Sequence, residues 1–280
     1  MHQRNNTLIM KKLIIICALL KIISACAPSE IILENRTDCP CMVYVNFSAL
    51  TPEVKRADLW FWGEDGKYEF YHRYEVPFPD DLYVPVRKGS TTACLWGNME
   101  STIADDTNRK LKFAREAELL WAWQETFDTK RDTATVTPIV ARRGCPVNVT
   151  IVSYKYAVEN ISVSISTKTS GYSYSGIPEQ GVFRYPLTHL PDEEQSAFEK
   201  YFRGIIPYQP FTGGIDIELN FIYDGFQRNS HFDLGRYLTL QQIDLEQAEE
   251  VNVVIEINEI TGTDISFNQE IAIHNYSIVL

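Results

Sequence analysis

The 280-residue sequence lacks the short motifs that mark common enzyme classes. It has no G-x-S-x-G nucleophile elbow, no H-E-x-x-H zinc motif and no G-x-x-x-x-G-K-[ST] phosphate loop. Acid pairs occur, but each stands beside a turn or loop signal, where carboxylates are normally solvated and not converging as a glycosidase pair must. We therefore expect no enzyme. The acid pairs with such neighbours include Glu64-Asp65, Asp80-Asp81, Asp105-Asp106 and Glu249-Glu250.

Metal-ligand patterns are also missing. Asp105 and Asp106 with Asn108 could offer oxygen ligands, but they lack the regular spacing of a calcium loop. The histidines are isolated from one another and from the cysteines, so we expect no metal or other cofactor. Those that follow the N-terminal segment are His72, His189, His231 and His274.

Basic residues are too few for a nucleic-acid-binding protein. The chain has 26 Lys and Arg against 37 Asp and Glu, a formal net charge of −11. Binding to phosphate needs clustered cations, and so does electrostatic attachment to anionic lipid. The aromatic share of 12 %, with 15 tyrosines, suits half-buried pleated surfaces instead. The composition indicates a globular, acidic protein with a core.

No apolar run is long enough to span a bilayer. Residues 13–25 fall short of the ~20 apolar residues that a spanning helix needs, and Lys21 interrupts them. Two lysines precede this run, and it closes on the letters ISAC, the small-residue pattern of a bacterial lipoprotein signal. We expect residues 1–25 to be a signal peptide, with Met10 as the initiator, and Cys26 to be acylated. Cleavage would leave 255 residues with a net charge of −15.

Four cysteines remain after Cys26, and an exported compartment permits disulfides. Cys39 and Cys41 lie too close in an extended segment to meet the preferred Cα separation. Each is therefore expected to pair with Cys94 or Cys145, the alternative being free buried thiols. A zinc site is disfavoured, because the spacing is not C-x-x-C and no histidine lies nearby.

Short stretches of alternating apolar residues predict an all-β protein. Regular spacing with turns between is typical of β-sandwiches. We expect a tether at residues 26–38, then two sandwich domains at 39–143 and 144–280, with the boundary near Arg143. The first has candidate strands at residues 42–47, 59–62, 67–74, 82–86, 91–96 and 133–140; the second has them at 147–154, 161–165, 215–222, 251–257, 271–273 and 276–280.

Local signals refine this pattern. Asp65-Gly66 predicts a hairpin turn, and Pro85 predicts an edge strand or bulge because proline cannot donate to a ladder. Short helices are expected at residues 109–115 and 116–123. A third helix is expected to begin at Pro191. Its buried face would carry Phe198, Tyr201 and Phe202, and Gly204 would end it.

Two aromatic groups stand out. Trp60-Phe61-Trp62 has large apolar residues on both faces of one strand, which favours burial on both sides over an exposed sugar platform. Tyr172 and Tyr174 alternate with serines and are the better candidates for exposed glycan contact, although a plain loop would read the same way.

The first part of the chain resembles a known family. After the lipoprotein cysteine and tether come Asp38-Cys39-Pro40, then residues 54–66 (VKRADLWFWGEDG), 82–89 (LYVPVRKG) and 94–98 (CLWGN). This order is similar to the FimB-type, or minor-fimbrium, anchor family of Bacteroidales fimbrial lipoproteins. The resemblance is specific from Cys26 to Asn98 and architectural beyond it. Cys41 departs from the pattern.

The resemblance implies two transthyretin-like β-sandwich domains, with short helical insertions, in a lipoprotein of the cell outer membrane. It implies a protein that tethers a fimbrium and joins pilin subunits by exchange of a β-strand. The alternative function is a surface lipoprotein that binds polysaccharide. The C-terminal segment has the length and alternation of a donor strand, or it completes its own sheet. Its candidate residues are Ile271, Ile273, Tyr276, Ile278 and Leu280.

Overall fold

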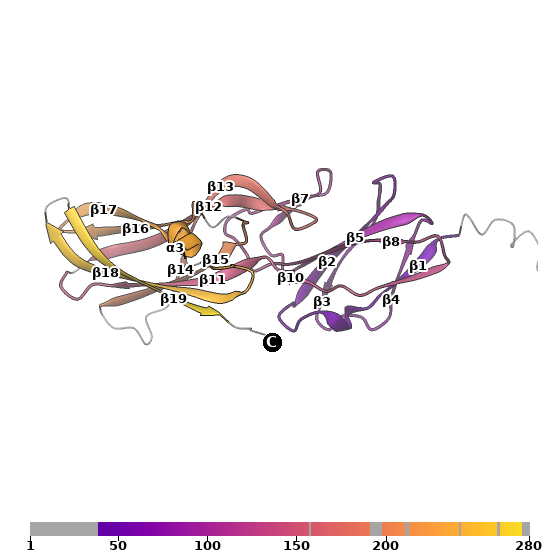
Figure 1. Ribbon diagram of the computed structural model, residues 1–280, viewed down its shortest axis with the longest axis horizontal. Coiled ribbons are helices and arrows are strands. Elements are labelled where there is room, and N and C mark those ends of the chain that lie inside the picture. The colour runs from indigo at the N-terminus through magenta and orange to yellow at the C-terminus, as the bar shows by residue number, and fades with distance from the viewer. Residues whose placement is uncertain are drawn as a thin grey trace, which may run out of the picture.

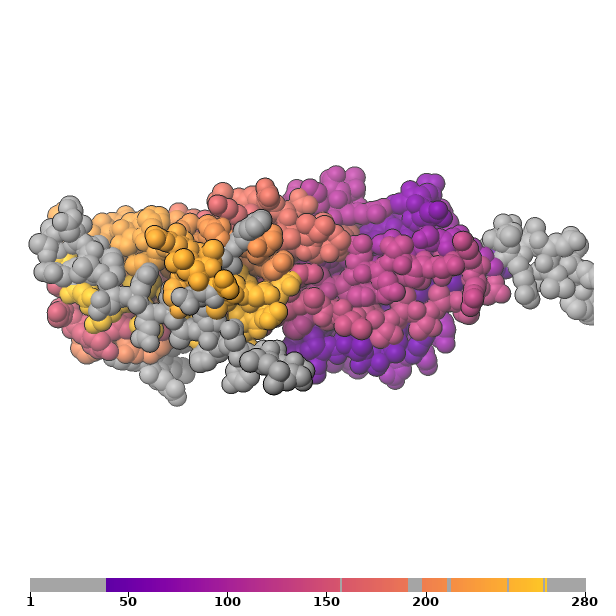
Figure 2. Space-filling view, viewed as in Figure 1, coloured from indigo at the N-terminus to yellow at the C-terminus, as the bar shows by residue number. Residues whose placement is uncertain are grey.

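The computed structural model describes residues 39–156, 158–190, 198–210, 213–240, 242–261 and 264–275. Over these ranges the protein is mostly β-structure, with one short α-helix, α3 (Leu234–Leu240), and a 3-10 turn, η1 (Phe47–Ala49). No helix within them is long and apolar enough to cross a membrane. The molecule is elongated, with the early strands at one end and the late strands at the other (Figures 1 and 2). The predicted β-rich class is confirmed.

Eight strands of the first half, residues 39–143, form two sheets. These are β1 (Cys41–Val45), β2 (Arg56–Gly63), β3 (Tyr68–Glu75), β4 (Leu82–Val86), β5 (Ser90–Gly97), β8 (Trp121–Asp128), β9 (Thr133–Val136) and β10 (Ala141–Arg142). Sheet A has the order β4-β1-β9, and sheet B has the order β10-β8-β5-β2-β3. Val43 and Val84 from sheet A share an apolar cluster with Leu59 and Leu95 from sheet B. The two sheets therefore enclose a core.

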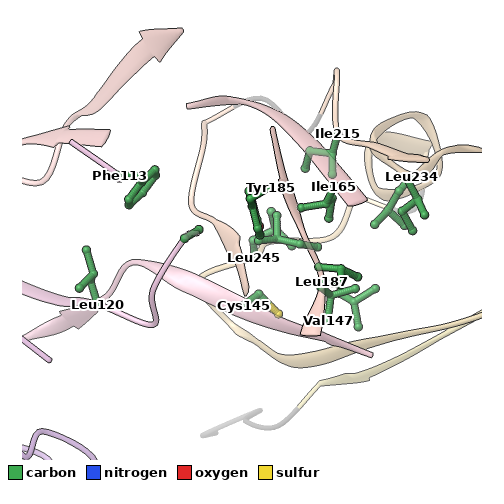
Figure 3. Packing of buried hydrophobic residues seen from close by; sticks show 14 of the residues in the cluster. Phe113, Leu120, Cys145, Val147, Ile165, Tyr185, Leu187, Ile215, Leu234 and Leu245 are labelled. Carbon is green, nitrogen blue, oxygen red and sulfur yellow. The ribbon is translucent and has the colours of Figure 1, made fainter. Parts of the chain in front are cut away.

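Two larger sheets are built from the second half, residues 144–275, together with β6 and β7 from the first half. Their strands are β6 (Ile103–Asp105), β7 (Lys110–Lys112), β11 (Gly144–Val152), β12 (Glu159–Ser173), β13 (Pro178–Pro186), β14 (Thr188–His189), β15 (Glu199–Pro207), β16 (Asp216–Tyr223), β17 (Phe226–Asp233), β18 (Ala248–Thr261) and β19 (Asp264–Asn275). Sheet C has the order β17-β16-β12-β7-β6, with β13 also on β12, and sheet D has the order β14-β15-β11-β18-β19. Ile165 and Ile215 lie across the core from Val147, and Tyr185 and Leu245 fill the space nearer the first half (Figure 3).

Sheet C contains strands from both halves. The long strand β12 pairs with β16 over residues 159–166 and with β7 over residues 171–173. Gly171 permits the second pairing, because a Cβ at this position would collide with the carbonyl oxygen of Leu111 and lie 3.0 Å from the Cα of Lys112. Residues 103–112 therefore belong by hydrogen bonding to the second half, although they precede Arg143.

Several local predictions are confirmed. Strand β1 alternates between fully buried and half-buried residues, and β2 is buried on both faces. Gly66 has a φ of 73° in the tight turn between β2 and β3. Pro85 lies in β4, an edge strand of sheet A, where its missing N–H leaves the single ladder to β1 in place.

The helix predictions are wrong. Residues 110–112 and 121–128 are strands, and the residues between them are irregular. Residues 199–204, expected to end a helix begun at Pro191, lie in strand β15, while 191–197 are outside the described residues. Pairing with β11 overrides the helical spacing of Phe198 and Phe202: Phe202 is buried in the core, but Phe198 is half exposed.

Candidate functional site: the junction between the two halves

Some of the predicted site residues lie outside the described chain. Cys26, the expected lipid attachment site, does so, and so do Tyr276, Ile278 and Leu280. Ile271 and Ile273 lie in β19, which pairs antiparallel with β18 from Asp264 to Asn275. Up to Asn275 the segment therefore completes its own sheet, which was the alternative to strand donation.

The expected disulfides are not present. Cys39, Cys41, Cys94 and Cys145 are free thiols; Cys39 is exposed and the other three are buried. Cys94 donates to the carbonyl of Tyr174, and Cys145 donates to that of Ala248, so their thiols are engaged in different places. Burial raises the pKa of Cys94, and it raises the pKa of Cys145 to about 12. Of the four cysteines, only Cys94 lies in a strand predicted from the sequence, and no local pattern shows which thiols will meet.

Tyr172 and Tyr174 are not exposed, so their prediction as glycan contacts is wrong. Their side chains are 0 % and 2 % exposed. Tyr172 lies near the end of strand β12 and Tyr174 in the turn that follows it, and both pack against tryptophans of the first half. The Tyr-Ser-Tyr-Ser sequence resembles an exposed loop because it does not show that residues of the first half will cover it.

Tyr174 packs between two tryptophans of the first half. Its ring centroid lies 4.9 Å from that of Trp60 and 5.3 Å from that of Trp62. The side chains of these tryptophans point from β2 to the face opposite that of Phe61. Phe61 belongs to the core between sheets A and B. The prediction that residues 60–62 are buried on both sides is confirmed, and one of the two sides is the junction.

Polar groups fix Tyr174 from several directions. Its carbonyl accepts hydrogen bonds from the thiol of Cys94 and the indole of Trp96, each at 3.1 Å. Its hydroxyl donates to a carboxylate oxygen of Asp106, and the same oxygen accepts from the indole of Trp60 at 3.1 Å. Burial, reinforced by the bond to Asp106, raises the pKa of Tyr174 well above its usual range. The tyrosine therefore stays a neutral donor.

Tyr172 is fully buried in the junction and contacts both halves. Its ring stacks on Trp96 at 5.4 Å and meets Phe113 edge-on at 5.6 Å. Its hydroxyl donates to the carbonyl of Arg143 at 2.7 Å and also reaches that of Tyr208 at 3.3 Å. The side chain thus connects sheet B with the segment that leads into the second half.

Arg142 and Arg143 hold this connecting segment against the second half. Arg142 donates to the carbonyls of Glu246 and Ala248. Arg143 pairs with the carboxylate of Glu246, and its guanidinium lies 5.4 Å from the ring centre of Tyr208. Both side chains lie against residues of the second half.

A buried carboxylate supports the same sheet on its outer face. Asp58 is fully buried in β2 and accepts from Tyr71 at 2.7 Å and from Arg73 at 2.8 Å. Burial, together with this bond, raises the pKa of Tyr71 to about 12. Tyr71 also packs on Trp60, with ring centres 4.9 Å apart. Asp58 therefore fixes the strand that presents Trp60 to the junction.

A cleft of about 760 Å³ opens beside the junction. It is lined by both halves, including Arg56 and Glu118 from the first and Tyr185 and Arg203 from the second. The carboxylate of Glu118 accepts from the backbone N–H groups of residues 100–102 and from the hydroxyl of Thr102. This carboxylate is fully occupied in holding the loop after β5.

The contacts at the junction join the two halves of the protein and do not resemble a catalytic or metal-binding site. Among the described residues no group of three or more His, Cys, Asp or Glu side chains is placed to hold a metal ion. Interleaved aromatic rings, a shared sheet and paired arginines instead join the two halves. Sequence inspection missed this junction, although Trp60 and Trp62 in one half and Tyr172 and Tyr174 in the other share the two-residue spacing of one strand face.

Comparison with known proteins agrees with this architecture. Residues 36–279 match the family described as fimbrillin-A associated anchor proteins Mfa1 and Mfa2. The fold is similar to the fimbrial anchor protein Mfa2 from Porphyromonas gingivalis, with a TM-score of 0.64 and 16 % identity over 85 % of this chain and 100 % of that one. No curated protein matched the sequence.

Two further structures share the fold. One is a candidate adhesin from Bacteroides ovatus, with a TM-score of 0.62 and 15 % identity over 86 % of this chain and 96 % of that one. The other is a candidate polysaccharide-binding protein from Bacteroides thetaiotaomicron, with a TM-score of 0.59 and 15 % identity over 85 % and 99 %. Since the family match covers most of the sequence, the chain belongs to the Mfa2 family of fimbrial anchor proteins, which are not enzymes.

Proposed function

We propose that this protein anchors a fimbrium to the outer membrane through acyl chains on Cys26. The observation that carries the proposal is the position of Cys39, the first described residue. It precedes β1 at the end of the molecule farthest from the second half (Figure 1). Residues 26–38 can span at most about 45 Å, so the first half would stand next to the membrane and the second half would point away.

Membrane attachment is tested by Cys26→Ser. A single acyl chain binds a bilayer only marginally, whereas the several chains of a lipoprotein cysteine hold it stably. The variant should therefore leave the membrane and appear as folded protein in the soluble fraction. Cys39→Ser is the matched control, since it removes an exposed thiol without touching the lipid site. Retention of Cys26→Ser in the membrane would refute the lipid anchor.

The second half would join the first pilin by strand complementation. Strand β18 begins at Ala248, which pairs with Asn275, the last described residue. Tyr276, Ile278 and Leu280 alternate in this segment. An extended segment with that alternation could fill core pockets of an incomplete pilin sheet while its backbone pairs with the open edge. We assign donation to residues 276–280 and keep β19 in place.

Two variants separate this assignment from donation of the whole of β19. Removing residues 276–280 should abolish pilin capture. Val254→Cys with Glu270→Cys, which are directly opposite in the β18–β19 ladder, would cross-link β19 to β18 and should leave capture intact. Loss of capture on cross-linking, restored by reduction, would show that β19 itself has to leave its sheet.

A further inference from the structure

We propose that β1 is a shear clamp through which tension between the membrane tether and the second half enters the fold. The direction of the pull rests on the proposed attachment at Cys26. The mechanical property itself belongs to the strand arrangement and can be measured on the purified protein.

Strand β1 is held on both sides. It is the central strand of sheet A, antiparallel to β4 from Cys41 to Val45 and parallel to β9 from Met42 to Val45. The N–H of Met42 donates to the carbonyl of Asp132 at 2.8 Å, and that of Asn46 donates to the carbonyl of Val136 at 2.9 Å. The ladder thus includes the residue before β9 and the residue after β1. Its inward side chains are wholly buried: Cys41, Val43 and Val45.

The direction of β1 follows from its neighbours. Strand β8 begins at Trp121, whose partner in β10 is Arg142 at the junction, and runs outward to Asp128. The next strand, β9, therefore runs back from the outer end toward β10. Since β1 is parallel to β9, its Cys41 end faces outward and its Val45 end faces the junction (Figure 1). A pull on Cys39 away from the molecule acts along the axis of β1.

The load leaves sheet A through β9. Residues 137–143 lead from the end of β9 to β11 in sheet D and include the two-residue strand β10, which pairs with β8. A pull between tether and second half therefore draws β1 and β9 in opposite directions along their shared ladder. The hydrogen bonds of the ladder run between the two strands. A pull along the strands therefore loads all of them together, whereas peeling would break them one after another. While the pair holds, the pull passes from β1 to β9 without running along the backbone of residues 46–132.

The test is single-molecule stretching of the chain from Ala27 onward, held at its two ends and carrying Cys39→Ser. Tyr44→Cys with Thr135→Cys places a cross-link between directly opposite residues of β1 and β9 whose side chains face away from the core. In the reduced protein, rupture of the clamp should unfold the first half and pull β7 away from β12, which releases residues 41–136, an extension of roughly 300 Å. In the oxidised protein the cross-link carries the load, and this step should vanish.

A second cross-link serves as the control. Thr92→Cys with Thr126→Cys joins β5 to β8 within residues 46–132. It should shorten the released length by roughly 110 Å and leave the rupture force unchanged, because this cross-link does not touch the ladder between β1 and β9. An unchanged step with the β1–β9 cross-link, or an equal rise in rupture force with the control, would overturn the clamp. Neither outcome bears on membrane attachment, which Cys26→Ser tests separately.

Discussion

The hydroxyl of Tyr174 donates a hydrogen bond to the carboxylate of Asp106, a residue 68 positions earlier in the chain. The same carboxylate accepts from the indole of Trp60. One acid thus joins a tyrosine that directly follows strand β12 to a tryptophan of strand β2. Because these strands belong to sheets C and B, the contact connects the halves of a protein that we propose to act under tension.

Removing the Tyr174 hydroxyl should weaken the junction modestly. Tyr174→Phe keeps the ring between Trp60 and Trp62 and loses the bond to Asp106, which is solvent-exposed, so the free energy of unfolding should fall by about 1 kcal/mol. Tyr174→Ala also loses the ring and should cost about 3–5 kcal/mol. Urea unfolding of both variants measures the two contributions. Equal losses would show that the ring packing contributes nothing.

Gly171→Ala should disrupt the pairing of β7 with β12. The added Cβ would collide with backbone atoms of Leu111, which cannot move aside as a flexible side chain can. The expected loss of stability is about 2–3 kcal/mol, with faster amide exchange at Lys110–Lys112. Gly213→Ala is the matched control, since a Cβ there would meet no atom within 4 Å. Normal exchange in Gly171→Ala would contradict the close approach.

Glu118 should make the protein less stable in acid. Burial opposes ionisation of this carboxyl, but hydrogen bonds from Thr102, Ser101 and Glu100 outweigh it and lower its pKa below 4.5. A depressed folded-state pKa stabilises the protein above the unfolded pKa, and the gain is lost as pH falls through the folded value. Glu118→Gln should therefore destabilise at pH 7, and its difference from the parent should shrink in acid.

The control for Glu118 is its exposed neighbour Glu116. Denaturant unfolding of Glu116→Gln at pH 7 should match the parent protein, because an exposed charge contributes little. A destabilisation by Glu118→Gln that persists undiminished at low pH would instead point to a packing defect.

Thiol labelling should distinguish one cysteine from the other three. In a soluble Cys26→Ser protein lacking the signal peptide, Cys39 should react quickly, since it is exposed. Burial protects Cys41, Cys94 and Cys145 and raises their pKa values, which lowers the reactive thiolate fraction. Denaturation without reductant should then reveal four thiols. Finding only two or none would restore the disulfides expected from the sequence.

Strand prediction succeeded where burial shows in the local pattern. The alternation in residues 42–47, the Asp65-Gly66 turn and Pro85 all carried their structure in a few neighbouring residues, because side-chain direction in a strand depends only on parity. Helix prediction failed at residues 199–204, where spacing suited a helix but pairing with β11 decided the outcome. Local propensity is a weak constraint once a sheet offers a full ladder.

The sequence alone determined the acidic charge, most strands and the resemblance to a fimbrial anchor, and it predicts a lipoprotein signal, since each depends on residue type or short-range spacing. Only the tertiary structure decided which faces are covered. It buried Tyr172 and Tyr174, left the four cysteines as free thiols, and carried residues 103–112 into a sheet of the second half. The physical reason is that burial and pairing join residues many positions apart, and no local pattern records which surface will cover another.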